Sequence, residues 1–202
     1  MVCKKQETMS SRDSILAAVK ASQPSAKPLP VIDHRGLADQ SDDHITSFAR
    51  YLEAGGGSMI RVKNMSEVRQ IVNDTKLSGA LVLNLVPQVA GIDAIPASTD
   101  VLDELQQVFI LGSLAVAENG AVWVPESTML NRILPFISDQ LFLVVNQKDL
   151  VPTMHEAYAK IRVDEDGFGV FIAGPSKTAD IEQSLVIGAH GPRKMVVLMI
   201  EE

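Results

Sequence analysis

The sequence predicts an α/β fold in which a mostly parallel sheet is covered by helices on both faces. Short runs that are almost wholly apolar, such as residues 80–85, 141–145 and 195–200, alternate with segments of helical periodicity. Strands buried on both faces read as continuous apolar runs, and amphipathic helices supply their cover. The 202 residues are 46% hydrophobic but only 4% aromatic, which suits one domain with an aliphatic core.

The first part of the chain reads as a helical extension. Residues 11–21 have the cap and the narrow apolar stripe of a short helix. Residues 22–30 hold three prolines, which is typical of an extended linker. We therefore expect an N-terminal helix and linker over residues 1–40 and an α/β domain over residues 41–202. The helix could dock on a partner subunit or pack on its own domain.

Helices and strands alternate from residue 41 onward. Residues 41–54 repeat apolar side chains at helical spacing, and three glycines at 55–57 end that helix. Such a glycine run could also let the backbone approach a ligand closely. The same patterns predict a strand over 58–62, a helix over 66–76, a strand over 80–85, a helical turn over 99–107 and a strand over 108–111.

A hairpin interrupts the alternation at residues 115–124. Asn119 and Gly120 stand between two short apolar runs and tolerate positive φ, so they predict a tight turn. Trp123, the single tryptophan, could belong to the core or line a pocket, and its N–H needs a partner.

The last third of the chain returns to alternation. The predicted elements are a strand over 141–145, a helix over 150–162 capped near Asp149, a strand over 169–173, a helix after Thr178 and a strand over 195–200.

The loop that follows residues 169–173 is the candidate binding segment. Gly174 and Pro175 form a turn directly after the strand, and the hydroxyls of Ser176 and Thr178 precede the expected helix. Free N–H groups and the helix dipole at such a start favour a bound anion. Parallel sheets also bind ligands at the carboxyl ends of their strands.

The same loop has a purely structural interpretation. Thr178 or Asp180 could simply cap the helix, and Asp180 with Gln183 has the spacing of a capping box. Residues 188–192 would then be a turn into the last strand. The loop is not a P-loop, because the order of glycine, lysine and hydroxyl is wrong.

Charge and composition exclude several classes of function. The net charge of −7 argues against general affinity for nucleic acid or anionic membranes. The only cysteine, Cys3, cannot hold an iron–sulfur cluster, and the four histidines lack metal-ligand spacing, so we expect no metal and no cluster on this chain. The sequence specifies no other cofactor. Because neither a membrane span nor a signal peptide is visible, we expect a cytoplasmic protein.

Three segments resemble the LUD-domain family, in particular its lactate utilization protein C group. The stretch GPSKTADIEQSLVIGAHGPRK resembles the family signature of the form GPSxTADIE followed by GxHGP. AENGAVWV resembles the family's AExGT segment, and Arg132-Ile133-Leu134-Pro135 resembles its arginine–leucine–proline stretch. The resemblance covers residues 55–200. It departs from the family at Asn119-Gly120-Ala121, where a Thr-Gly-Thr-like triplet is commoner.

The resemblance implies a fold related to ribose-5-phosphate isomerase, glucosamine-6-phosphate deaminase and CoA transferases. It also implies a role in bacterial metabolism, the oxidation of L-lactate to pyruvate, alongside two partner proteins that carry iron–sulfur clusters. This chain would then be the component without its own metal.

Our first hypothesis is that the chain binds a small carboxylate or a phosphate-bearing ligand between the loop after Gly174 and the hairpin at Glu118. Arg132 or Arg193 would add a bidentate contact to a carboxylate, and Asp180 with His190 would act as an orienting pair or as acid and base. The expected binding residues are Gly174, Ser176, Lys177, Thr178, Asn119, Gly120, Arg132 and Arg193.

Two further hypotheses belong to other functional classes. Glu118-Asn119-Gly120 resembles the site at which some CoA transferases form an acyl anhydride on glutamate, so the chain could be an acyl-transfer enzyme. Alternatively, the N-terminal helix could clasp a neighbour in a scaffold subunit without catalysis, and a homo-oligomer is one form of such an assembly.

Overall fold

The structure is a computed structural model that describes residues 10–28, 30, 33, 43–178, 186–188 and 190–202. The chain separates into two units, Met1–Asp33 and His34–Glu202. Within the described ranges, no helix has both the length and the apolar character needed to cross a membrane.

Helix α1 (Ser11–Ala21) is the described helix of the first unit and has the predicted bounds. The hydroxyl of Ser10 caps it by accepting a hydrogen bond from the Asp13 N–H. None of its residues is buried, and its apolar stripe of Ile15, Leu16 and Val19 is exposed. The expectation that α1 docks on a partner subunit, like the division of the chain at residue 40, stays a prediction.

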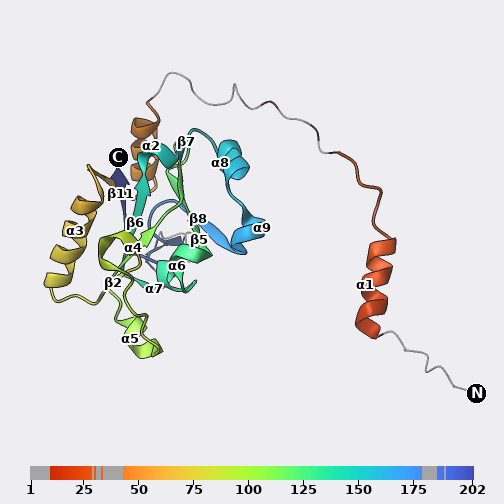
Figure 1. Ribbon diagram of the computed structural model, residues 1–202, viewed down its shortest axis with the longest axis horizontal. Coiled ribbons are helices and arrows are strands. Elements are labelled where there is room, and N and C mark those ends of the chain that lie inside the picture. The colour runs from red at the N-terminus through yellow and green to blue at the C-terminus, as the bar shows by residue number, and fades with distance from the viewer. Residues whose placement is uncertain (1–9, 29, 31–32, 34–42, 179–185, 189) are drawn as a thin grey trace, which may run out of the picture. The chain divides into compact units, whose positions relative to one another are not determined.

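A five-stranded parallel sheet forms the centre of the second unit, in the order β1-β11-β6-β3-β2 (Figure 1). Its strands are β1 (Ser58–Val62), β2 (Val82–Asn84), β3 (Gln107–Leu111), β6 (Gln140–Asn146) and β11 (Lys194–Ile200). All four neighbouring pairs are parallel. The predicted α/β class with a mostly parallel sheet is therefore confirmed.

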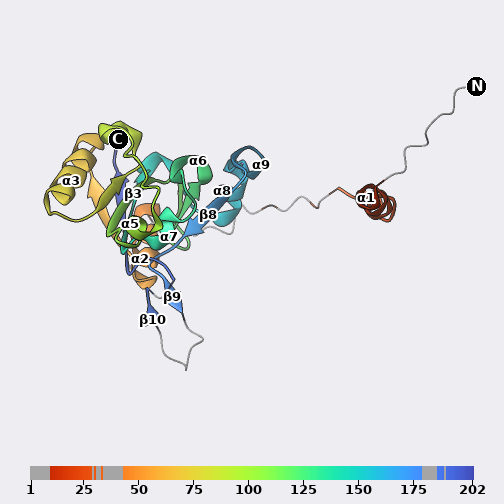
Figure 2. The ribbon, with the colours of Figure 1, turned by 90° about the horizontal axis from the view of Figure 1, so that it is seen from below.

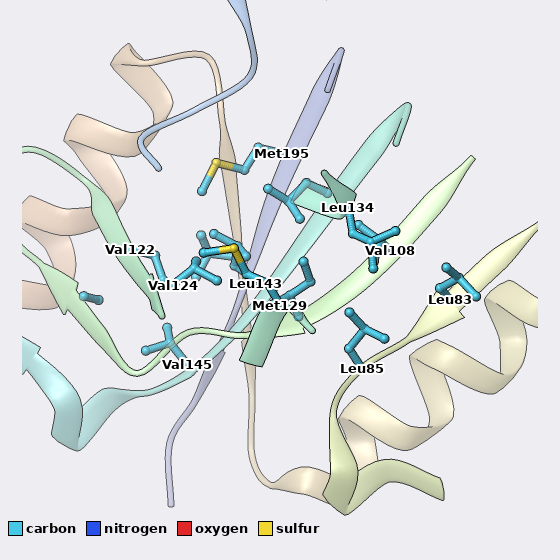
Figure 3. Close-up of a cluster of buried hydrophobic side chains, with 14 of the residues drawn as sticks. Leu83, Leu85, Val108, Val122, Val124, Met129, Leu134, Leu143, Val145 and Met195 are labelled. Carbon is cyan, nitrogen blue, oxygen red and sulfur yellow. The ribbon is translucent and has the colours of Figure 1, made fainter. Parts of the chain in front are cut away.

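The two faces of this sheet are covered differently. Helix α3 (Met65–Leu77) and the turn α4 (Pro87–Ala90) pack on one face, where Phe109 and Phe142 stack at 4.2 Å between ring centroids. On the other face lie α2 (His44–Ala54), α5 (Thr99–Asp103), α6 (Glu126–Met129), α7 (Leu134–Ile137) and a second sheet. Figure 3 shows this second cluster, in which side chains of the strands meet Val122, Val124, Met129 and Leu134.

The second sheet has the strand order β7-β4-β5-β8. Its strands are β4 (Leu114–Val116), β5 (Ala121–Pro125), β7 (Leu150–Val151) and β8 (Gly169–Ile172). β4 and β5 form the predicted hairpin, with Gly120 at φ 67° and the Asn119 Oδ1 accepting the Ala121 N–H at 3.0 Å. The placement of residues 169–173 in the parallel sheet was wrong, because β8 pairs antiparallel with β5.

The predicted helix over residues 150–162 was also wrong in its first part. Leu150 and Val151 form β7, which pairs with β4, and the helix α8 spans only Met154–Lys160. Pro152 explains the break, since the residue before a proline disfavours the helical region. The cap is Thr153, whose hydroxyl accepts the Glu156 N–H at 3.3 Å, and not Asp149, which lies in the short helix η1 (Gln147–Asp149). A further turn, α9 (Val163–Asp166), precedes β8.

The described residues on either side of the predicted helix after Thr178 are extended, and the helix itself falls on residues 179–185, outside the described residues. Lys177–Thr178 form β9, which pairs antiparallel with β10 (Val186–Ile187), and Figure 2 shows the two strands side by side. Ile187, whose side chain is β-branched, favours this strand pairing. Residues 179–185, which include Asp180 and the expected capping box, lie outside the described residues.

The two outer strands of the parallel sheet are bounded in different ways. β2 has three residues, and the fully buried Asn84 at its end donates to the carbonyl oxygens of Val86 and Gly91 at 3.2 and 2.8 Å. β1 is longer and carries Arg61, whose guanidinium lies 2.8 Å from the Glu201 carboxylate beyond β11.

Candidate functional site

The turn that follows β8 is fixed by contacts with β11 and with the turn before it. Gly174, at φ 89°, donates its N–H to the thioether sulfur of Met195 at 3.1 Å. Ser176 donates its N–H to the carbonyl oxygen of Pro192 at 2.9 Å and accepts the Gly188 N–H at 3.1 Å. The Ser176 N–H is therefore already used in a hydrogen bond. The prediction that it is free to bind an anion was wrong.

This turn also lies at the amino ends of the parallel strands, whereas we expected it at their carboxyl ends. Its partners Pro192 and Met195 stand at the amino end of β11, and the neighbouring Gly55 precedes the amino end of β1. The rule that ligands bind at the carboxyl ends of parallel strands therefore does not apply, because β8 belongs to the other sheet.

The end of α2 lies against both the turn and the hairpin. A Cβ at Gly174 would come within 2.4 Å of the Gly55 carbonyl oxygen, and a Cβ at Gly120 would come within 2.4 Å of the Leu52 nitrogen. The pairing of Val122 with Ile172 places the hairpin turn and the Gly174 turn at the same end of the β5–β8 pair. The two segments of the expected site are thus neighbours, with backbone-to-backbone contacts to one helix.

Glu118 and Asn119 have clear roles in holding the hairpin. One carboxylate oxygen of Glu118 accepts the Met154 N–H at 2.7 Å, at the start of α8, and the Glu118 N–H donates to Pro152 at 3.1 Å. A carboxylate in the first turn of a helix stabilises it. Glu118 therefore links the hairpin to α8, while its side chain stays exposed.

The two candidate arginines are both engaged by carboxylates. Arg132 makes a bidentate contact with Glu126, at 2.7 and 2.8 Å, and lies over the Phe168 ring at 4.6 Å. The hydrogen bond from Arg132 holds the pKa of the Glu126 carboxyl below its ordinary value of 4.5 and raises the pKa of Arg132. Because this fork is occupied, Arg132 offers no second bidentate contact without releasing Glu126.

Arg193 is held in the same manner by Asp139. Its Nε donates to the Asp139 carboxylate, and this hydrogen bond raises the pKa of Arg193. Its aliphatic stem passes so close to Gly188 that a Cβ there would lie 2.2 Å from it. Arg193 therefore braces the turn between β10 and β11.

Ser176, Lys177 and His190 keep hydrogen-bonding groups that the described part of the chain does not use. The Ser176 hydroxyl would lie 3.3 Å from a Cβ at Gly191, beside the exposed His190. The Lys177 stem runs along Gly56, with Nζ 3.5 Å from the Cβ position there. The Ser176 hydroxyl lies toward Gly191 and the Lys177 ammonium toward Gly56, so these two side chains point to opposite sides of the turn, as successive residues in extended backbone do.

Sequence reasoning missed the residues that hold the two arginines, Glu126, Phe168 and Asp139. Glu126 is six positions from Arg132, and Asp139 is 54 positions from Arg193, so neither spacing is a helical one. Only the pairing of strands brings Asp139 and Arg193 together.

Metal binding finds no support among the described residues. There, no three side chains of histidine, cysteine, aspartate or glutamate gather closely enough to hold a metal ion.

The contact of Gly120 with α2 predicts a large effect of one methyl group. Gly120→Ala should lower the free energy of unfolding by at least about 2 kcal/mol, because it adds a clash to the cost of a positive φ. Gly79→Ala is the matched control, since Gly79 has φ 82° and nothing within 4 Å of its Cβ position. Urea unfolding at 25 °C measures both changes, and equal losses would show that the contact with Leu52 is unimportant.

The pairing of Glu126 with Arg132 predicts a pH-dependent stability. A carboxyl whose pKa is lowered on folding stabilises the protein above its unfolded-state pKa, and this contribution disappears as the pH falls through the folded-state value. Glu126→Gln should therefore be less stable than the parent at pH 7, and the difference in stability should be smaller at pH 3. Urea midpoints at both pH values, with Asp74→Asn as control, check this. A difference that does not change with pH would contradict it.

Comparison with known proteins adds sequence relatives to this geometry. Residues 99–200 match the profile of the LUD domain. Lactate utilization protein C of Bacillus pumilus is 31% identical over 99 residues, which are 46% of this chain and 41% of that protein. The corresponding Geobacillus kaustophilus protein is 28% identical over 109 residues, or 51% and 45% of the two chains. The match thus spans less than half of these relatives' own length.

A solved structure shares the fold. The crystal structure of a DUF162 family protein from Deinococcus radiodurans superposes with a TM-score of 0.58 at 18% identity, over 78% of this chain and 96% of that one. It supports the α/β architecture described above. Because the LUD profile covers half of the sequence, from α5 to β11, this chain belongs to the LUD domain family.

Proposed function

We propose that this chain is the non-metal component of a bacterial lactate utilization system and binds a small carboxylate, such as L-lactate or pyruvate. The support comes from relatives named lactate utilization protein C and from the LUD profile, which covers residues that include the turn after β8. The two electrons released by lactate oxidation are assigned in this proposal to partner proteins that carry iron–sulfur clusters.

One observation carries the proposed binding site. Ser176, Lys177 and His190 lie in or next to the turn after β8, and none of their side chains has a hydrogen-bond or ion-pair partner in the described ranges. A carboxylate would accept hydrogen bonds from the hydroxyl and the imidazole, and the lysine would add charge. In this proposal Gly174, Arg193 and the hairpin at Asn119 and Gly120 hold the turn. The roles of Thr178 and of Asp180, as the acid–base partner of His190, stay predictions.

A thermal-shift titration tests this site. L-lactate, pyruvate or phosphate, at a concentration ten times its dissociation constant, should raise the melting temperature by about 3 °C. The reason is that a ligand that binds only the folded state stabilises it by roughly 1.4 kcal/mol at this concentration. Ser176→Ala and Lys177→Met should each weaken binding by about tenfold. Lys63→Met is the control, and sodium chloride corrects for ionic strength.

The outcome that would overturn this proposal is equally definite. If 50 mM lactate, pyruvate and phosphate shift the melting temperature no more than chloride does, the anion site is wrong. The same conclusion follows if Lys63→Met weakens binding as much as Lys177→Met.

Acyl transfer at Glu118 is the alternative, and one observation favours it. One oxygen of the Glu118 carboxylate is fixed on the Met154 N–H, while the other accepts no hydrogen bond within the described residues. A fixed, exposed carboxylate is what a nucleophile needs. Glu118→Gln keeps the oxygen that caps α8 but removes the nucleophile. It should abolish acyl-CoA hydrolysis or transfer without loss of stability, and equal rates in parent and variant would remove this alternative.

A further inference from the structure

One hollow in the second unit is lined by Trp123, the only tryptophan of the chain. It has a volume of about 390 Å³ and is lined by residues of the second sheet and of the α8–α9 connection. Trp123, Leu114 and Ile161 form its apolar lining. Trp123 and Leu114 are direct partners across the β4–β5 hairpin, so their side chains lie on the same face. The hollow therefore has a rigid apolar floor.

The indole N–H of Trp123 is available to a ligand. Trp123 is only 5% exposed and packs on Phe171 at 4.7 Å, yet its nitrogen donates no hydrogen bond within the part of the chain that the structure describes. Among the described residues, Ser138 Oγ is the only fully buried side-chain polar atom left without a partner. The indole nitrogen therefore retains access to solvent. The hollow is a solvent-accessible space that Trp123 lines.

The charged residues around the hollow leave one charge of each sign unpaired. Arg162 is neutralised by Glu165 at 2.8 Å and by Asp164 at 3.4 Å. Asp149 and Lys160 also line the hollow, and in the described ranges neither makes an ion pair or a side-chain hydrogen bond. One carboxylate, one ammonium and an indole N–H thus surround an apolar floor.

We propose that this hollow binds a small zwitterion with an apolar side chain, namely an apolar α-amino acid of about the size of leucine. Asp149 would accept hydrogen bonds from the ligand's ammonium group, and Lys160 and the indole N–H would donate to its carboxylate. The side chain would lie on Trp123, Leu114 and Ile161. A simple carboxylate such as lactate fits poorly, because it leaves Asp149 unpaired beside a second negative charge. The volume is at the lower end of small-molecule pockets, as this ligand size requires.

Tryptophan fluorescence gives a direct test, since Trp123 is the single tryptophan. L-leucine should change the emission in a saturable manner. Two analogues keep the carbon skeleton but lose one charge: 4-methylpentanoate lacks the ammonium group, and 3-methylbutylamine lacks the carboxylate. Each should bind at least about tenfold more weakly than leucine. L-lactate should leave the emission unchanged, which separates this site from the one proposed for lactate.

Variants assign the two charges. Asp149→Asn should weaken leucine binding about tenfold without weakening the binding of 4-methylpentanoate. Lys160→Met should weaken leucine binding about tenfold without weakening the binding of 3-methylbutylamine. Lys148→Met is the control, and circular dichroism confirms that each variant is folded. The proposal is overturned if leucine gives no saturable change in emission, if either analogue binds as tightly as leucine, or if Asp149→Asn has no effect. Leucine binding seen by ligand-observed NMR without a change in emission would also overturn it.

Discussion

The burial of one parallel sheet on both faces is the constraint on which the second unit depends. An aliphatic sheet with few aromatic residues must be covered completely, because each exposed strand would leave a wide apolar surface in water. α3 supplies the cover on one side. The β4–β5 hairpin and α2 together cover the other side. The core cluster there contains side chains of the strands together with Val122, Val124, Phe48 and Leu52. The position of α2 is thus set by the core and not by the site.

That position in turn determines what the site can be. α2 ends where the hairpin turn and the Gly174 turn both touch its backbone, and glycine is the residue that permits such contacts. The N–H groups of Gly174 and Ser176 are used to hold the turn, through Met195 and Pro192. Binding there must therefore depend on side chains, in contrast to the main-chain anion sites at helix starts that the motif first suggests.

Much of the fold could be predicted from local pattern, and the failures have physical causes. β1 and α1 have the predicted bounds, because periodicity and flanking residues specify them locally. β7 and α8 were misread because Pro152 divides a segment that is otherwise helical in composition. The membership of β8 in the second sheet depends on pairing with β5, which lies 44 residues earlier in the chain at the Pro125–Gly169 pair and 50 residues earlier at the Val122–Ile172 pair. No local signal in the sequence predicts this pairing. In the site, the adjacency of hairpin and turn was foreseen, but the partners of Arg132 and Arg193 were not.

The outer strands of the parallel sheet have a consequence for behaviour at high concentration. An unpaired strand edge is a template for joining sheets of neighbouring molecules end to end. β2 offers only three residues, too few to anchor another strand, while β1 offers five but presents the guanidinium of Arg61, held in place by Glu201. A second molecule that aligned its own β1 there would bring two guanidinium groups together. The short β2 and the charged side chain on β1 would therefore disfavour the addition of a further strand at either edge.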